Sequence, residues 1–167
     1  MRPICLALAA AVMIPADAGA QGGLAPPPPL VGQAEQLFLA HCVPNADDPA
    51  RALDGLMNSG AFASQETSTD GSTTLHGANG QLVARIVQGG ASHDSCAIRA
   101  GNIPNAKLKV GQSAARLATG LDLPLGQERP SLAYPTGAQI MHMDAHNIRV
   151  AQPADTADVV EISLSKS

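Results

Sequence analysis

The sequence predicts an α+β fold, in which a small, mainly antiparallel sheet carries two to three helices and one disulfide staples the domain. Helix-like and strand-like segments occur in separate blocks rather than in strict alternation, which favours an antiparallel sheet with helices on one face. An Asn79-Gly80 pair between two β-prone segments predicts a hairpin. Two cysteines, Cys42 and Cys96, follow the N-terminal segment and form a candidate disulfide.

The first 20 residues have the pattern of a cleavable signal peptide. Met1-Arg2 precedes an apolar run from Ile4 to Ile14, which is shorter than the roughly 20 residues that a membrane helix needs. Ala18-Gly19-Ala20 offers the small residues that signal peptidase reads, so cleavage is expected before Gln21. The pattern predicts a bacterial-type exported protein, in the periplasm or extracellular, with no transmembrane segment after cleavage.

A proline-rich stretch follows the predicted cleavage site. Residues 21–32 contain four consecutive prolines, which favour an extended polyproline II conformation and therefore a tether. The amino-acid composition does not change abruptly anywhere in residues 33–167, and their number suits a single domain.

The two cysteines of the predicted domain are interpreted first as a disulfide. An even number of cysteines in an oxidising compartment is typical of structural bridges, and a loop of this length would contribute roughly 4 kcal/mol of stability. His41 precedes Cys42 directly, and His93 precedes Cys96 by three residues, so a catalytic thiolate is the alternative. No recognisable thiol-enzyme motif surrounds either cysteine, and the disulfide is the prediction.

The first half of the domain is expected to contain two helices and three strands. Asp47 and Asp48 stand at an N-cap position, Pro49 is suited to a first helical turn, and Gly60 is suited to a helix end. The predicted elements are helices at 33–42 and 49–59, a polar loop at 63–72, and strands at 73–76, 81–87 and 95–99.

The second half is expected to contain one helix and two or three strands. Apolar residues at intervals of three and four predict a helix over 104–118, and three prolines predict an irregular connection over 123–137. A strand is predicted at 139–143, with a possible continuation through Ile148 and Val150. Apolar and polar residues alternate over 158–165, which predicts a strand with one solvated face.

Composition excludes nucleic acid as an expected partner. The formal net charge is −4, and the chain has two Phe, one Tyr and no Trp. Nucleic-acid binding usually requires a basic surface and aromatic stacking platforms.

A local cluster at residues 141–146 is the candidate metal site. If this segment is one strand, His142, Asp144 and His146 share a face, because side chains alternate with period two. Such a set could bind Cu or Zn with one more donor. The candidates for that donor are His76 and His93. The competing interpretation is a strand end with its methionines in the core and its histidines in water, so no cofactor is expected and Cu or Zn is the alternative.

No high-specificity catalytic or nucleotide-binding motif occurs in the chain. The leading hypothesis is therefore a non-enzymatic binding or envelope-associated domain whose partner is an envelope protein or another macromolecule. The alternatives are the metal-binding protein and an exported hydrolase. The candidate residues of the hydrolase are His76, His93, His142 or His146, together with Asp94 or Asp144.

Overall fold

The computed structural model describes residues 29–77, 79–88 and 94–167. Within these ranges it contains three α-helices and one eight-stranded antiparallel sheet, which confirms the α+β prediction. The predicted signal peptide, residues 21–28 of the predicted tether and His93 lie outside the described residues.

The helices occur in two places along the chain. The first two are linked by a π-helical turn at Phe38–Cys42 and a 3-10 turn at Val43–Asn45. Their bounds are α1 (Pro29–Leu37), α2 (Pro49–Asn58) and α3 (Ala106–Leu121). The Asp48 carboxylate caps α2 by accepting a hydrogen bond from the Arg51 amide at 3.1 Å, as the N-cap signal predicts. None of the helices in the described ranges is both long and apolar enough to cross a bilayer.

Each half of the sheet is a four-stranded meander. The strands of the first half are β1 (Ser64–Thr67), β2 (Ser72–His76), β3 (Leu82–Val87) and β4 (Asp94–Ala100). Those of the second half are β5 (Leu125–Glu128), β6 (Ala138–Met143), β7 (His146–Ala151) and β8 (Val160–Lys166). The order across the sheet is β1-β2-β3-β4-β8-β7-β6-β5, so the last strands of the two halves pair in the middle.

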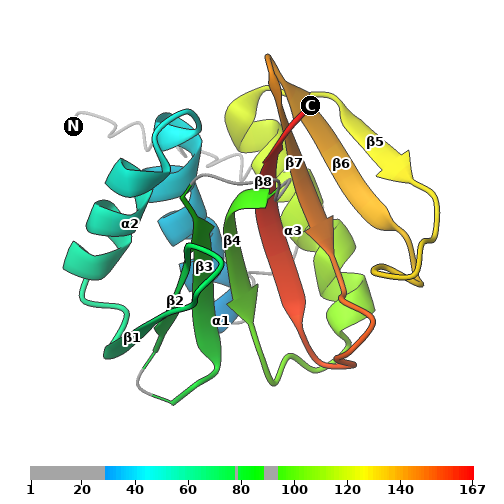
Figure 1. Cartoon of the computed structure of the whole chain (residues 1–167). Helices are drawn as coiled ribbons and strands as arrows, with labels where there is room; N and C mark the ends of the chain where they lie inside the picture. The colour runs from blue at the N-terminus through cyan, green and yellow to red at the C-terminus, as the bar shows by residue number, and fades with distance from the viewer. Residues whose placement is uncertain (1–28, 78, 89–93) are drawn as a thin grey trace, which may run out of the picture.

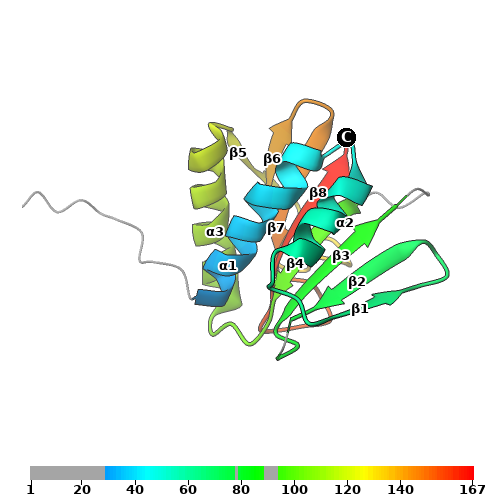
Figure 2. The ribbon, with the colours of Figure 1, turned by 90° about the vertical axis from the view of Figure 1, so that its left-hand side faces the viewer.

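All three helices lie on the same side of the sheet (Figures 1 and 2). One apolar cluster joins them to it. On β4, for example, Ile98 belongs to this cluster and is 0% exposed, while Arg99 points the other way. Among the described residues no helix lies over the opposite face of the sheet, the uncovered face.

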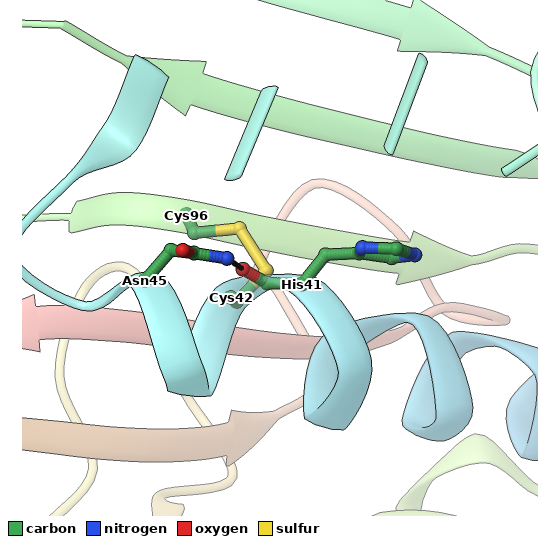
Figure 3. The surroundings of a disulfide bond; sticks show 4 residues. All are labelled: His41, Cys42, Asn45 and Cys96. Carbon is green, nitrogen blue, oxygen red and sulfur yellow. Dashed lines mark hydrogen bonds between the residues drawn. A yellow bond between two sulfur atoms is a disulfide. The ribbon is translucent and has the colours of Figure 1, made fainter. Parts of the chain in front are cut away.

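A disulfide joins the helical layer to the centre of the sheet (Figure 3). Cys42 and Cys96 are bonded at 2.03 Å between their sulfurs, with a Cα–Cα distance of 5.9 Å, which confirms the predicted bridge. Beside it, the Asn45 side-chain amide donates to the His41 carbonyl at 2.8 Å and closes the turn that carries Cys42.

The predicted start of the first helix and two predicted loops are wrong. Helix α1 begins at Pro29 rather than at residue 33, because proline is tolerated in a first helical turn and Val31 is buried in the core. The tether therefore cannot extend to residue 32. The predicted loops at 63–72 and 123–137 contain β1 and β5, which are short edge strands with mostly exposed side chains and so lack a burial pattern.

Two other expectations about the last strands need correction. The chain does not continue as one strand from 139 to Val150, because it turns at Asp144-Ala145 and returns as β7. Asp144 adopts a φ of 49°, a left-handed conformation that Asp tolerates in tight turns. The second face of β8 is not solvated either. Its polar residues are 1–4% exposed; they are Glu161, Ser163 and Ser165. Arg99 and Tyr134 contact the Glu161 carboxylate on this face, and Ser163 lies between its pairing partners Ala97 and Arg149.

Candidate functional site

The uncovered face brings together charged residues from strands that are far apart in the sequence. Residues that pair directly across antiparallel strands share a face, with Cβ atoms about 5 Å apart. The register pairs Val83 with Arg99 and Arg99 with Glu161. The adjacent row pairs Arg85 with Ala97, so Arg85 and Arg99 are diagonal neighbours on the same face.

A hollow of about 290 Å³ lies on this face. Apolar, cationic, acidic and hydroxyl-bearing side chains line it together, and apolar area with a few polar groups is typical of binding sites. Its lining residues are Thr74, Val83, Arg85, Val87, Ala97, Arg99, Tyr134 and Glu161.

Glu161 anchors one wall of the hollow. Arg99 Nε donates to Glu161 Oε2 at 2.5 Å, and the Tyr134 hydroxyl donates to Glu161 Oε1 at 2.8 Å. The Glu161 side chain is 5% exposed, whereas that of Arg99 is 45% exposed. Both carboxylate oxygens thus hold neighbours in place, and Arg99 remains accessible beside them.

The pairing with Glu161 favours the charged form of Arg99. Partial burial of the guanidinium lowers its pKa, but the Glu161 carboxylate more than offsets that effect, and the pKa of Arg99 is raised above its ordinary value. A guanidinium is protonated at neutral pH in any case, and the pairing with Glu161 favours this charged form further.

The loop between β5 and β6 brings Tyr134 over the uncovered face. Gly137 donates its amide to the Tyr134 carbonyl at 2.9 Å and has a φ of +79°. A Cβ at this position would lie 2.9 Å from the Glu128 carbonyl oxygen, so the turn requires glycine. The Arg149 guanidinium lies 5.4 Å from the Tyr134 ring centroid, a cation–π arrangement, and its Nε donates to Glu128 Oε2 at 2.7 Å.

Arg85 is held from the opposite side by the hairpin between β1 and β2. Its Nη2 donates to Asp70 Oδ2 at 3.1 Å, and its side chain is 53% exposed. The Ser72 hydroxyl and then the Ser72 amide, which both donate to Asp70 Oδ1, hold the pKa of Asp70 below its ordinary value. Asp70 therefore stays ionised as the partner of Arg85 at neutral pH.

The two arginines keep N–H donors beyond those that bind their carboxylate partners. Each guanidinium has five N–H donors, and the bonds to Asp70 and Glu161 use one on each arginine. Val83, Val87 and Ala97 provide an apolar surface beside these donors.

The structure does not place the predicted metal ligands on one face. His142 pairs with Asn147 across the hairpin, and Met143 pairs with His146, so the two histidines lie on opposite faces of the sheet. The premise that one strand carries His142, Asp144 and His146 is therefore wrong. In the described ranges, no three His, Cys, Asp or Glu side chains converge in a geometry that could hold a metal.

Each of these residues has its own surroundings. His142 is exposed, and its Nδ1 lies 2.6 Å from the Asn147 side-chain oxygen. The His146 side chain is 4% exposed, and its Nε2 lies 3.5 Å from Asp47 Oδ1, which is longer than a good hydrogen bond. Asp144 is exposed in the turn between them.

The remaining candidates are not brought together with the hairpin histidines. His76 is on β2, and five strand spacings separate β2 from β6, about 24 Å along the sheet. Asp94 begins β4, and its side chain is not described. The structure does not bring His76 and His142 into one site. The hydrolase alternative stays a prediction, and no arrangement of these residues supports it in the part of the chain that the structure describes.

A metal titration tests the remaining possibility at the hairpin. We expect about 1 mM Zn²⁺ or Cu²⁺ at pH 7 to leave the midpoint of thermal unfolding unchanged, because the two imidazoles face opposite sides of the sheet. This concentration is on the order of a hundredfold above the dissociation constant of a site with a Kd of about 10 µM. A bound ion at that excess would stabilise the fold by about 2.7 kcal/mol. A gain that disappears near pH 5 and in both His142→Ala and His146→Ala would contradict this expectation, since imidazole must be unprotonated to bind metal.

Sequence reasoning missed the arginines and Tyr134 as site residues. Arg85 is the charged residue of an otherwise apolar strand. This position could have indicated that one face of the strand is exposed to solvent. The Arg99–Glu161 pair joins residues 62 positions apart, and no local pattern predicts that pairing.

Comparison with protein-family models, curated protein sequences and solved structures found no match to this chain.

Proposed function

We propose that this protein is an exported, non-enzymatic domain that binds an envelope protein through the uncovered face of its sheet, centred on the hollow. The observation that carries the proposal is the hollow itself, in which Arg85 and Arg99 remain about half exposed beside an apolar floor. Surface concavities that combine apolar area with a few convergent polar groups are the usual places for binding.

The buried carboxylate of Glu161 fixes one wall of the hollow, which supports a binding role. Two ion pairs hold its arginines from different elements, Arg85 from the β1–β2 hairpin and Arg99 from β8. Such pre-positioned donors lose less conformational entropy when a ligand arrives. The acidic lining residue Glu161 already accepts bonds from Arg99 and from the Tyr134 hydroxyl, so these groups hold one wall of the hollow in place.

Export is supported by the apolar N-terminal run and by the disulfide, since structural disulfides persist mainly in oxidising compartments. Expression of the full chain in a Gram-negative host should yield a periplasmic product whose first residue, identified by mass spectrometry, is Gln21. An unprocessed cytoplasmic product would contradict the export proposal.

The binding proposal is tested with a substitution that fills the hollow. The immobilised wild-type protein is expected to retain an envelope protein from an extract, and Ala97→Trp is expected to reduce its retention at least tenfold. Ala50→Trp, the same change on an exposed position of α2, is the matched control and should retain the partner. Circular dichroism establishes that each variant is folded.

A second variant keeps the test informative if Ala97→Trp does not fold. Arg85→Glu reverses one charge at a half-exposed position and should also reduce retention. If both variants retain the same proteins as the wild type, the uncovered face is not the binding surface, and the proposal fails.

A further inference from the structure

We propose that the hollow receives the C-terminal carboxylate of a peptide chain whose last side chain is aliphatic. The inference rests on the proposed function, because it names the group that the hollow would bind. It follows from the donors on Arg85 and Arg99, from the neighbouring apolar residues and from the position of the hollow on a face rather than an edge.

The donors favour a carboxylate. Two guanidinium groups on adjacent strands line the same hollow, and guanidinium forks match the two oxygens of a carboxylate. The acidic neighbours Asp70 and Glu161 already accept hydrogen bonds from these arginines, so they orient the two guanidinium groups. An incoming carboxylate would therefore meet positioned donors.

The apolar lining distinguishes a chain terminus from an acidic side chain. In a C-terminal residue the carboxylate and the side chain are attached to the same carbon, so a carboxylate held by the arginines places that side chain a few ångströms away. Val83 and Ala97 pair with Arg99 and Arg85 in the β3–β4 register, and all four side chains line the hollow. A glutamate or aspartate side chain would instead bring its own polar backbone to these residues.

The place of the hollow in the sheet also favours a terminus. Its strand residues come from β2, β3, β4 and β8, which all have a neighbouring strand on both sides. An extended peptide cannot add to these strands by backbone hydrogen bonds, so recognition must come from side chains. A chain end can enter the hollow with its terminal residue alone.

The test compares small peptides on the full, processed protein. N-acetyl-Ala-Ala with a free carboxylate is expected to bind at least tenfold more tightly than its C-terminal amide, measured by isothermal titration and by shifts of the Arg85 and Arg99 side-chain resonances. N-acetyl-Glu amide carries a side-chain carboxylate only, and it is expected to bind at least fivefold more weakly than the free acid. Inorganic phosphate is the probe for a non-specific anion site.

Variants identify the residues involved. Arg85→Gln should reduce affinity for the free acid at least tenfold, and Arg85→Lys should restore part of it, because lysine keeps the charge without the fork. Arg51→Gln, at an arginine that is 78% exposed on α2, is the matched control and should leave affinity unchanged. Ala97→Leu should weaken the acid and the amide alike by filling the hollow.

The outcomes separate this inference from the proposed function. Equal affinity for acid and amide, or an unaltered affinity in Arg85→Gln, overturns the C-terminal assignment. If Ala97→Trp nevertheless abolishes retention of the envelope protein, the binding surface stands and only the recognised group is wrong. Tighter binding of phosphate or of N-acetyl-Glu amide than of the free acid also overturns the inference.

Discussion

Removal of the disulfide is expected to have the largest effect on stability. Cys42→Ser or Cys96→Ser should lower the free energy of unfolding by about 4 kcal/mol under oxidising conditions, because the bridge closes a segment with a sequence separation of 54. For a domain of this size the thermal midpoint should fall by roughly 10 °C. Both cysteines are buried, at 0% and 2% exposure, so the buried serine hydroxyl adds a further cost of about 1 to 3 kcal/mol to this value.

The control for this prediction is the redox state. In strong reductant the wild type loses the same constraint, so the difference between wild type and variants should shrink to the cost of the buried hydroxyl. Circular dichroism melts at matched protein concentration measure both conditions. An equal midpoint for wild type and variants under oxidising conditions would exclude a structural role for the bridge.

Loss of the ion pair between α1 and α3 is expected to have the second largest effect. Arg116 Nη2 and Nε donate to the two Glu35 oxygens at 2.7 and 3.1 Å, and the side chains are 22% and 10% exposed. Glu35→Ala leaves the guanidinium without its acceptor in the helical layer. Removing one partner of a buried pair costs about 3 to 5 kcal/mol, and partial exposure of Arg116 reduces our expectation to about 2 to 3 kcal/mol.

The double variant tests the reason for this cost. Glu35→Leu combined with Arg116→Leu removes both charges and is expected to lie within about 1 kcal/mol of the wild type, because no charge is left unpaired. The matched control is Arg51→Ala, which removes the exposed pair with Asp48 and should cost at most about 1 kcal/mol. Urea denaturation at pH 7 gives all four values. A single variant as mild as Arg51→Ala would mean that water replaces the lost partner.

Local signals predicted a large part of the fold. Helix α2 has its cap, its first-turn proline and its apolar face within a dozen residues, and the structure contains it at Pro49–Asn58. The hairpin of β2 and β3 follows from the Asn79-Gly80 pair. The edge strands β1 and β5 were missed because they are strands only through pairing with β2 and β6, and their exposed side chains carry no alternation.

The candidate site could not be predicted to the same extent. The sequence alone was sufficient for the fold class, the position of α2 and the partner of Cys42, because these depend on patterns over a few neighbouring residues or on a choice between few cysteines. The burial of Glu161 and its pairing with Arg99 depend on which strands become neighbours, whereas the separation of His142 from His146 comes from the local turn at Asp144-Ala145. Turn type and the alternation of apolar and polar residues set the register within a hairpin. The pairing of β4 with β8, in contrast, arises from packing between segments about 60 residues apart, which no local pattern describes.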